Sequence, residues 1–187
     1  MSAMRNNAKT VAAVYDRRIE NETGAHRDAA TEQPLQTKTR LRRLNHVFVD
    51  APIYFVTACT LDRRAILDCE AVHEAFRTFC VNSPQHGVWV GRYVLMPDHL
   101  HLFVAMGEMP LSNWVKSLKN SLSKTLRCAG HEGPHWQKGF FDHLLRSGES
   151  YSQKWDYVRE NPVRAGLVAT PEDWPYAGEI HDLEYRK

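Results

Sequence analysis

The chain has 187 residues, of which 43% are hydrophobic and 25% are charged. These fractions are typical of globular proteins and argue against a fully disordered, collagen-like or coiled-coil chain. The formal net charge is only +2, so any contact with nucleic acid must depend on where the charges lie. No run approaches the roughly 18 apolar residues of a membrane span, and no signal-peptide core is present. We therefore expect a cytoplasmic protein with no membrane contact.

The first 37 residues differ in composition from the rest of the chain. They contain few large apolar residues and no continuing apolar stripe, which predicts a disordered or loosely helical N-terminal extension over 1–37. A main domain is expected over 38–178, followed by a C-terminal tail over 179–187. The main domain opens with a basic run that contains Arg42 and Arg43. Such a run is either a solvated arm or a phosphate contact.

The main domain alternates between strand and helix patterns. Runs rich in β-branched and aromatic residues predict strands, and apolar residues at helical spacing predict helices. In chain order we expect a strand over 53–60, a helix over 69–82 with Asp68 as N-cap, strands over 88–95 and 99–106 joined by a turn at 96–98, a helix from Leu111 to Leu126, a strand over 140–146, and a last helix opened by a Ser150-x-x-Gln153 capping box and broken at Pro162. This order predicts an α+β, ferredoxin-like (βαββαβ) fold: an antiparallel sheet with two helices on one face, plus a C-terminal helix.

Alternation along the strand at 99–106 separates two kinds of side chain. Leu100 and Leu102 begin an apolar face that would pack on the two helices, whereas His99 and His101 share the other face. Two imidazoles at this spacing can converge on one metal ion. Each can equally be a hydrogen-bonded structural histidine, so the pair alone leaves both interpretations open.

The last helix has one side that packs and one side that does not. At ~100° per residue, Tyr151, Trp155 and Val158 lie on the packing side, while Tyr157 and Asn161 lie on the opposite side. Tyr157 is either a partly exposed surface residue or a nucleophile or ligand directed at a site. Because Asn161 is one turn from Tyr157, the two can act at one centre.

Three segments, in order, carry a resemblance to a known family. They are MPDHLHLFV, WQKGFFDHLLRSGESY and YVRENPVRAGLV. They closely resemble segments of the REP-associated tyrosine transposases, which belong to the HUH single-tyrosine class. The resemblance runs from about Arg40 to Trp174 and does not include the N-terminal extension. The first segment supplies the paired-histidine motif, and the last supplies a Tyr-x-x-x-Asn helix.

The resemblance implies an enzyme that cleaves and rejoins single-stranded DNA at hairpins of repetitive extragenic palindromes. His99 and His101 would bind a divalent metal ion, with Asn161 as third ligand, and Tyr157 would form a 5′-phosphotyrosine link. A free tyrosine has a pKa near 10, so only about 0.1% is phenolate at neutral pH, and a nearby cation lowers that cost. Imidazoles alone favour zinc or another transition metal. With oxygen ligands added, the Mg²⁺ or Mn²⁺ of the family is expected.

The same resemblance directs attention to DNA contacts. The candidate phosphate contacts are Arg42, Arg43, Lys116, Lys119, Arg159 and Arg164. Trp136 is a candidate for stacking on an unpaired base, or else a packing residue. The protein is expected to act on the bacterial nucleoid as a monomer or homodimer.

Two alternatives to the transposase interpretation stay open. The first is a domesticated, non-catalytic binder of structured single-stranded DNA. The second is a metal hydrolase in which His131, His135 or His143 joins the histidine pair. The H-x-x-x-H spacing of the first two supports it, although the glycines and proline around them predict a loop.

Overall fold

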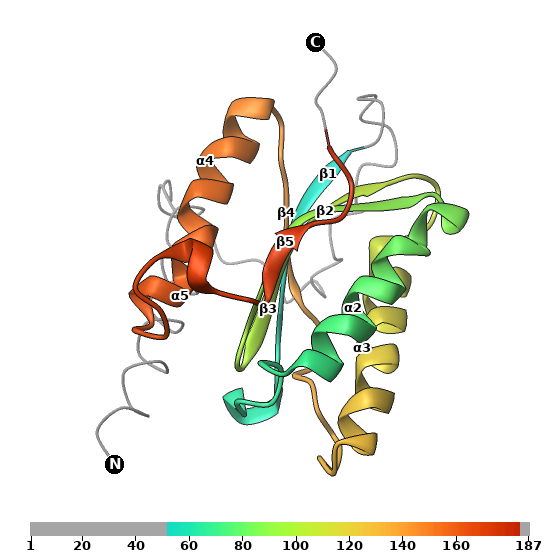
Figure 1. Ribbon diagram of the computed structural model, residues 1–187. Coiled ribbons are helices and arrows are strands. Elements are labelled where there is room, and N and C mark those ends of the chain that lie inside the picture. The colour runs from blue at the N-terminus through green and yellow to red at the C-terminus, as the bar shows by residue number, and fades with distance from the viewer. Residues whose placement is uncertain (1–51, 184–187) are drawn as a thin grey trace, which may run out of the picture. The chain divides into compact units, whose positions relative to one another are not determined.

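Figure 1 shows the computed structural model of the chain, which describes residues 52–183. The helices and strands in chain order are β1 (Ile53–Cys59), η1 (Leu61–Arg63), α2 (Glu70–Val81), η2 (Ser83–His86), β2 (Val88–Met96), β3 (His99–Met106), α3 (Leu111–Cys128), β4 (Phe141–Leu144), α4 (Gly148–Arg159), α5 (Asn161–Arg164), η3 (Pro171–Asp173) and β5 (Ala177–Glu179). The predicted order of strands and helices is confirmed. The predicted extension over 1–37, Arg42 and Arg43 lie outside the described residues.

The five strands form one antiparallel sheet in the order β4-β1-β3-β2-β5. The first four strands have the ferredoxin-like order, with β3 between β1 and β2. Helices α2 and α3 cover one face of the sheet, and α4 lies on the other side (Figure 1). The predicted α+β architecture is therefore confirmed, with a short fifth strand added at the β2 edge.

The main core lies between the sheet and the α2–α3 layer. It contains the predicted apolar face of β3, whose four members are Leu100, Leu102, Val104 and Met106. On the helix side, Leu118 and Leu122 of α3 are almost fully buried. Removing such side chains from water stabilises the fold by roughly 1.5–3 kcal/mol each. Because β3 alternates, this packing turns its histidines toward the opposite face.

A second packing layer joins α4 to that opposite face. The ring of Phe103 on β3 lies 4.7 Å from that of Tyr151 and 6.3 Å from that of Trp155, centroid to centroid. Tyr151 and Val158 are buried, as the helical spacing predicted. Figure 1 shows α4 across the sheet from α2 and α3. The helix that carries Tyr157 is therefore packed on the histidine face.

An irregularity in β2 permits this close approach. The pairing of β2 with β3 shifts register between Val90 and Tyr93. A Cβ atom at Gly91, inside that irregularity, would lie 2.7 Å from Leu183 Cδ1 and 3.0 Å from the Tyr151 hydroxyl. Real Cβ atoms essentially never lie closer than 3.0 Å to such a neighbour, so a larger residue at position 91 would require the Leu183 side chain to shift and the Tyr151 hydroxyl to give way slightly.

Several predicted boundaries differ from the structure, and three of them have a clear physical reason. Helix α2 is capped by Cys69 and not by Asp68, without a side-chain cap bond. Helix α4 begins earlier than predicted, because the extended Ser147 accepts a hydrogen bond from the Ser150 backbone nitrogen at 3.1 Å. Ser150 therefore lies in the first turn and does not open a capping box with Gln153. Strand β5 crosses the predicted boundary between 178 and 179, because Glu179 pairs with β2.

The break near Pro162 is confirmed. Helix α4 ends at Arg159, and the short α5 restarts at Asn161 with the proline in its first turn. This position suits proline, since the backbone nitrogens of a first turn have no helical acceptor. Gly166 follows in the left-handed region at φ +69°. Among residues 52–183, no helix combines the length and apolar character that crossing a bilayer requires.

Candidate active site

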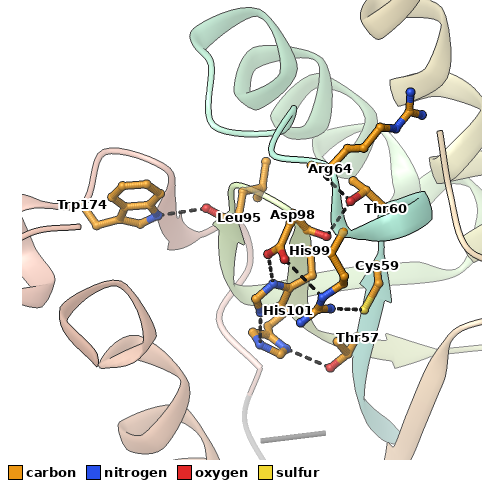
Figure 2. Close-up of polar contacts among 10 residues, drawn as sticks. Thr57, Cys59, Thr60, Arg64, Leu95, Asp98, His99, His101 and Trp174 are labelled. Atoms are coloured by element: carbon orange, nitrogen blue, oxygen red, sulfur yellow. Dashed lines mark hydrogen bonds and ion pairs between the residues drawn. The ribbon is translucent and has the colours of Figure 1, made fainter. Parts of the chain in front are cut away.

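The two histidines of β3 converge as their spacing predicted. His99 Nε2 and His101 Nε2 lie 3.1 Å apart, and the rings meet nearly edge to face at a centroid distance of 4.7 Å. Both side chains are buried, His101 completely. Figure 2 shows the rings side by side beneath the turn between β2 and β3.

Each histidine has a partner for its other ring nitrogen. His101 Nδ1 lies 2.8 Å from Thr57 Oγ1, and His99 Nδ1 lies 2.7 Å from Asp98 Oδ1 (Figure 2). Thr57 and His101 are direct cross-strand partners on β1 and β3. These bonds fix both ring orientations, so the two Nε2 atoms face the same point.

The electrostatics favour a neutral His101 beside an ionised Asp98 carboxylate. Burial lowers the pKa of His101 well below its ordinary value, and the nearby charges of His99 and Arg63 act in the same direction. Burial alone would raise the pKa of Asp98, but the hydrogen bond and charge of His99, with the charge of Arg63, hold it below its ordinary value. An ionised carboxylate only accepts hydrogen bonds, so His99 Nδ1 donates to Asp98.

This donor set fits a divalent cation. Two ligands about 2.1 Å from an ion at a right angle would be about 3.0 Å apart, close to the observed 3.1 Å between the Nε2 atoms. Two imidazole lone pairs at that separation repel, so a proton or a cation must lie between them. Thr57 can accept as well as donate, so its bond permits the His101 tautomer that offers Nε2 to a metal.

Helices α4 and α5 each bring one basic side chain near this pair. Phe55 stacks on His101 with ring centroids 5.4 Å apart and planes within 20°. The Lys154 ammonium of α4 lies over the Phe55 ring, 5.6 Å from its centroid. The charges of Lys154 and of Arg164 in α5 are both near enough to lower the pKa of His101. The tyrosine helix and the histidines therefore share one side of the sheet.

The predicted nucleophile and third ligand lie on either side of the helix break. Tyr157 is 36% exposed, whereas Asn161 is 6% exposed. The prediction that both lie on one outward face is therefore wrong for Asn161, because α5 restarts the helix in another direction. Arg164 joins the two: it donates to the Tyr157 carbonyl at 2.5 Å and to Asn161 Oδ1. Its guanidinium carbon lies 4.0 Å from the centre of the Tyr157 ring.

The predicted DNA contacts separate into two groups. Lys116 and Lys119 lie on α3, across the sheet from the histidines, and Lys119 donates to the carbonyls of Gln137 and Gly139. Trp136 is half-buried and donates its indole N–H to the Lys119 carbonyl, which favours the packing interpretation. The structure brings neither lysine nor Trp136 to the histidine face.

Arg159 is the predicted DNA contact that borders a pocket. Its guanidinium pairs with Glu172, and its side chain is 38% exposed. The pocket measures about 290 Å³ and lies between α4 and the segment that leads into β5. Two indoles line it, Trp155 and Trp174, and the Trp174 indole donates to the Leu95 carbonyl at 2.9 Å. Figure 2 shows Trp174 at that carbonyl, beside the turn that carries Asp98.

The histidine-rich alternative does not gain a third ligand from the structure. Within the described part of the chain, no group of three or more His, Cys, Asp or Glu side chains is placed to hold a metal ion. His135 is buried, with Nε2 2.9 Å from the backbone oxygen of His131. His143 is exposed on β4, opposite Phe55. A metal ion held by the histidine pair would therefore need further ligands of another kind, such as amide or phosphate oxygens.

The residues that orient the histidines are not among the predicted site residues. Asp98 directly precedes the pair, where the sequence predicts only a turn. Thr57 shares the alternation of Phe55 and Cys59 on β1, but only the strand register reveals that it faces His101. The proximity of Asp98 to the pair can be seen in the sequence, whereas that of Thr57 cannot.

Comparison with known proteins identifies the family of the chain. The sequence profile of the IS200-like transposases matches residues 49–161, more than half of the chain. The chain belongs to the IS200-like transposase family. A protein of Haemophilus influenzae described as a REP-associated tyrosine transposase is 26% identical over 152 residues, covering 73% of this chain and 85% of that protein. The REP-associated tyrosine transposase of Escherichia coli K12 is 26% identical over 96 residues, covering 50% of this chain and 56% of that protein.

A solved structure shows the same fold. A REP-associated tyrosine transposase bound to a REP hairpin superposes with a TM-score of 0.56 at 18% identity, covering 79% of this transposase and 98% of that chain. The region matched by the family profile, 49–161, includes both histidines, Tyr157 and Asn161. The resemblance drawn from three short segments is therefore confirmed at the level of family, fold and DNA transposition.

Proposed function

We propose that this transposase cleaves and rejoins single-stranded DNA through a covalent bond to Tyr157, as an HUH-type enzyme. The main support is the histidine pair: two Nε2 atoms 3.1 Å apart, each ring held at Nδ1 by Thr57 or Asp98. Such outer hydrogen bonds are characteristic of metal-binding histidines.

His99 and His101 would hold the metal ion, with an oxygen from Asn161 and phosphate oxygens completing its ligands. We propose Mg²⁺ or Mn²⁺, because oxygen donors dominate that set. When bound, such an ion polarises the scissile phosphate and offsets charge on its oxygens. The buried Asn161 amide already contacts Arg164 through Oδ1, and this oxygen has a second lone pair for a further partner.

Tyr157 would supply the nucleophile. Its phenol oxygen bonds to phosphorus as the bond from phosphorus to the 3′ oxygen breaks, which leaves a 5′-phosphotyrosine and a 3′-hydroxyl. The phenol proton is lost to solvent, and the 3′ oxygen gains one. A second 3′-hydroxyl can reverse the step, so no nucleotide cofactor is needed. The Arg164 guanidinium on the ring restricts the orientation of Tyr157.

The substrate we propose is the hairpin of a repetitive extragenic palindrome in nucleoid DNA, bound by a monomer or a homodimer. This proposal is supported by the relatives described above, one of which is bound to a REP hairpin. Arg159 and Arg164 lie on the α4–α5 side and are the candidate phosphate contacts. The pocket between Trp155 and Trp174 offers indole rings on which an unpaired base can stack.

The test is a covalent trapping experiment. A labelled single-stranded palindrome with flanks is incubated with the protein and Mg²⁺ or Mn²⁺, then denatured and separated by mass. Wild type should give a covalent band, and Tyr157→Phe should give none while binding the hairpin equally well. Tyr176→Phe, which keeps its ring contacts with His73 and Trp174, is the matched control. Wild-type binding without any band would favour the non-catalytic alternative.

A further inference from the structure

The loop after β1 is fastened to the turn that precedes the histidines. Thr60 donates to the Asp98 carbonyl through both its backbone nitrogen and its hydroxyl, each at 2.9 Å. Farther along, the backbone nitrogens of Ile66 and Leu67 donate to the Pro97 carbonyl at 2.8 and 2.9 Å. Four hydrogen bonds therefore hold residues 60–67 against the β2–β3 turn.

Two residues inside this loop have unusual backbone angles. Asp62 and Arg63 lie in the left-handed region, at φ 53° and 54°. Residues other than glycine adopt this region at a cost in free energy, and such strained residues are frequent at functional sites. The conformation directs the Arg63 side chain inward, where Nε lies 3.1 Å from Asp98 Oδ2 and Nη1 donates to Cys59 Sγ at 2.6 Å.

These contacts connect Arg63 to the histidine pair through one carboxylate. Asp98 faces Arg63 with Oδ2 and His99 Nδ1 with Oδ1. Only 18% of the arginine side chain and 13% of the aspartate side chain are exposed. A carboxylate held at both oxygens cannot rotate away from the imidazole, so it keeps the hydrogen on Nδ1 and the lone pair on Nε2.

We propose that Arg63 is a positioning residue of the metal site. Through Asp98 it fixes the tautomer and orientation of His99, so that the lone pair of Nε2 is directed at the point shared with His101. This inference rests on the proposed function, because it assigns the purpose of that orientation to metal binding. In this proposal, the strained backbone at Asp62 and Arg63 serves to direct one guanidinium toward Asp98.

The experiment compares wild type with Arg63→Gln, Arg63→Lys and Asp98→Asn. Arg64→Gln is the matched control, since Arg64 is the next residue of the loop and bonds to the carbonyls of Glu132 and Pro134, not to Asp98. The first readout is the ¹⁵N spectrum of the His99 ring recorded without metal. The second is Mn²⁺ affinity by electron paramagnetic resonance, and circular dichroism confirms folding.

Wild type and Arg64→Gln should show His99 protonated at Nδ1 alone. Arg63→Gln should show mixed tautomers and bind Mn²⁺ about tenfold more weakly, with Asp98→Asn in the 10–100-fold range typical of such partners. Arg63→Lys, which keeps the positive charge beside Asp98, should recover most of the affinity.

The proposal is overturned if folded Arg63→Gln keeps both the wild-type tautomer and the wild-type Mn²⁺ affinity. Loss of covalent DNA product with both readouts unchanged would also overturn it, by making Arg63 a direct DNA contact. If Arg63→Gln does not fold, Asp98→Asn tests the proposal in its place. Wild-type Mn²⁺ affinity in Asp98→Asn would show that Asp98 does not connect Arg63 to the metal site. Failure of the proposed function looks different: wild type would bind no Mn²⁺, while the ¹⁵N spectra would still test the link from Arg63 to His99.

Discussion

Replacing Thr57 by valine tests the histidine site through one buried hydrogen bond. The Thr57 hydroxyl lies 2.8 Å from His101 Nδ1, and both side chains are at most 3% exposed. Valine keeps the shape of threonine and its preference for strands. The substitution therefore removes the bond to His101 and little else.

The substitution should have two separate effects. In the folded protein, His101 Nδ1 loses its partner in a buried position, which costs about 1–3 kcal/mol of the free energy of unfolding. With metal bound, Nδ1 must carry the hydrogen, and its bond to Thr57 is strengthened by the cation. The bound state therefore loses more than the free state. We expect Mn²⁺ affinity to fall by about 10–100-fold, which is about 1.4–2.7 kcal/mol.

Urea denaturation measures the first effect, and Mn²⁺ titration by calorimetry measures the second. Thr57→Ser is the control, because it keeps the hydroxyl and should bind Mn²⁺ with nearly wild-type affinity. The reasoning is refuted if valine and serine bind Mn²⁺ equally well. It is also refuted if the valine variant loses stability alone, since Thr57 would then have only a structural role.

Two further predictions concern the core. Leu118→Ala should lower the free energy of unfolding by about 2–5 kcal/mol, because its side chain is 1% exposed between α3 and the sheet; a cost below 1 kcal/mol in urea denaturation would contradict the packing. Burial, with a smaller effect of the Arg77 charge, lowers the pKa of His73, although Glu70 and Glu74 oppose the shift. The unfolded chain then binds the proton first as pH falls below about 6.5, so stability is lost there by up to about 1.4 kcal/mol per pH unit. His73→Gln should reduce that slope, and an unchanged slope would assign it to other groups.

The sheet could be predicted because its central strands show strong local patterns. Strand β3 has the predicted bounds, 99–106, since its alternation separates two histidines from four apolar residues. Strand β5 has only three residues, none β-branched, and forms because β2 offers an unpaired edge. The start of α4 was missed for a related reason: Ser147 and Ser150 are equally good caps in sequence, and only the backbone angles distinguish them.

The histidine pair could be predicted, whereas its supporting residues could not. A period of two places His99 and His101 on one face of a strand. The bond from Thr57 to His101 spans 44 positions of sequence and depends on the register between β1 and β3. The position of Arg63 is still harder to predict, because a left-handed conformation at an arginine has no sequence signature.

The break between α4 and α5 explains why the tyrosine helix departs from its helical projection. An unbroken helix would place Asn161 about 40° from Tyr157 around the axis, exposed on the same side. Instead the chain restarts at Asn161, and its amide is turned into the protein while Tyr157 stays accessible. Arg164 spans the break, since it contacts the Tyr157 ring and carbonyl and donates to the Asn161 side chain. One arginine therefore holds the predicted nucleophile and the predicted third ligand in a fixed relation, although they belong to two different helices.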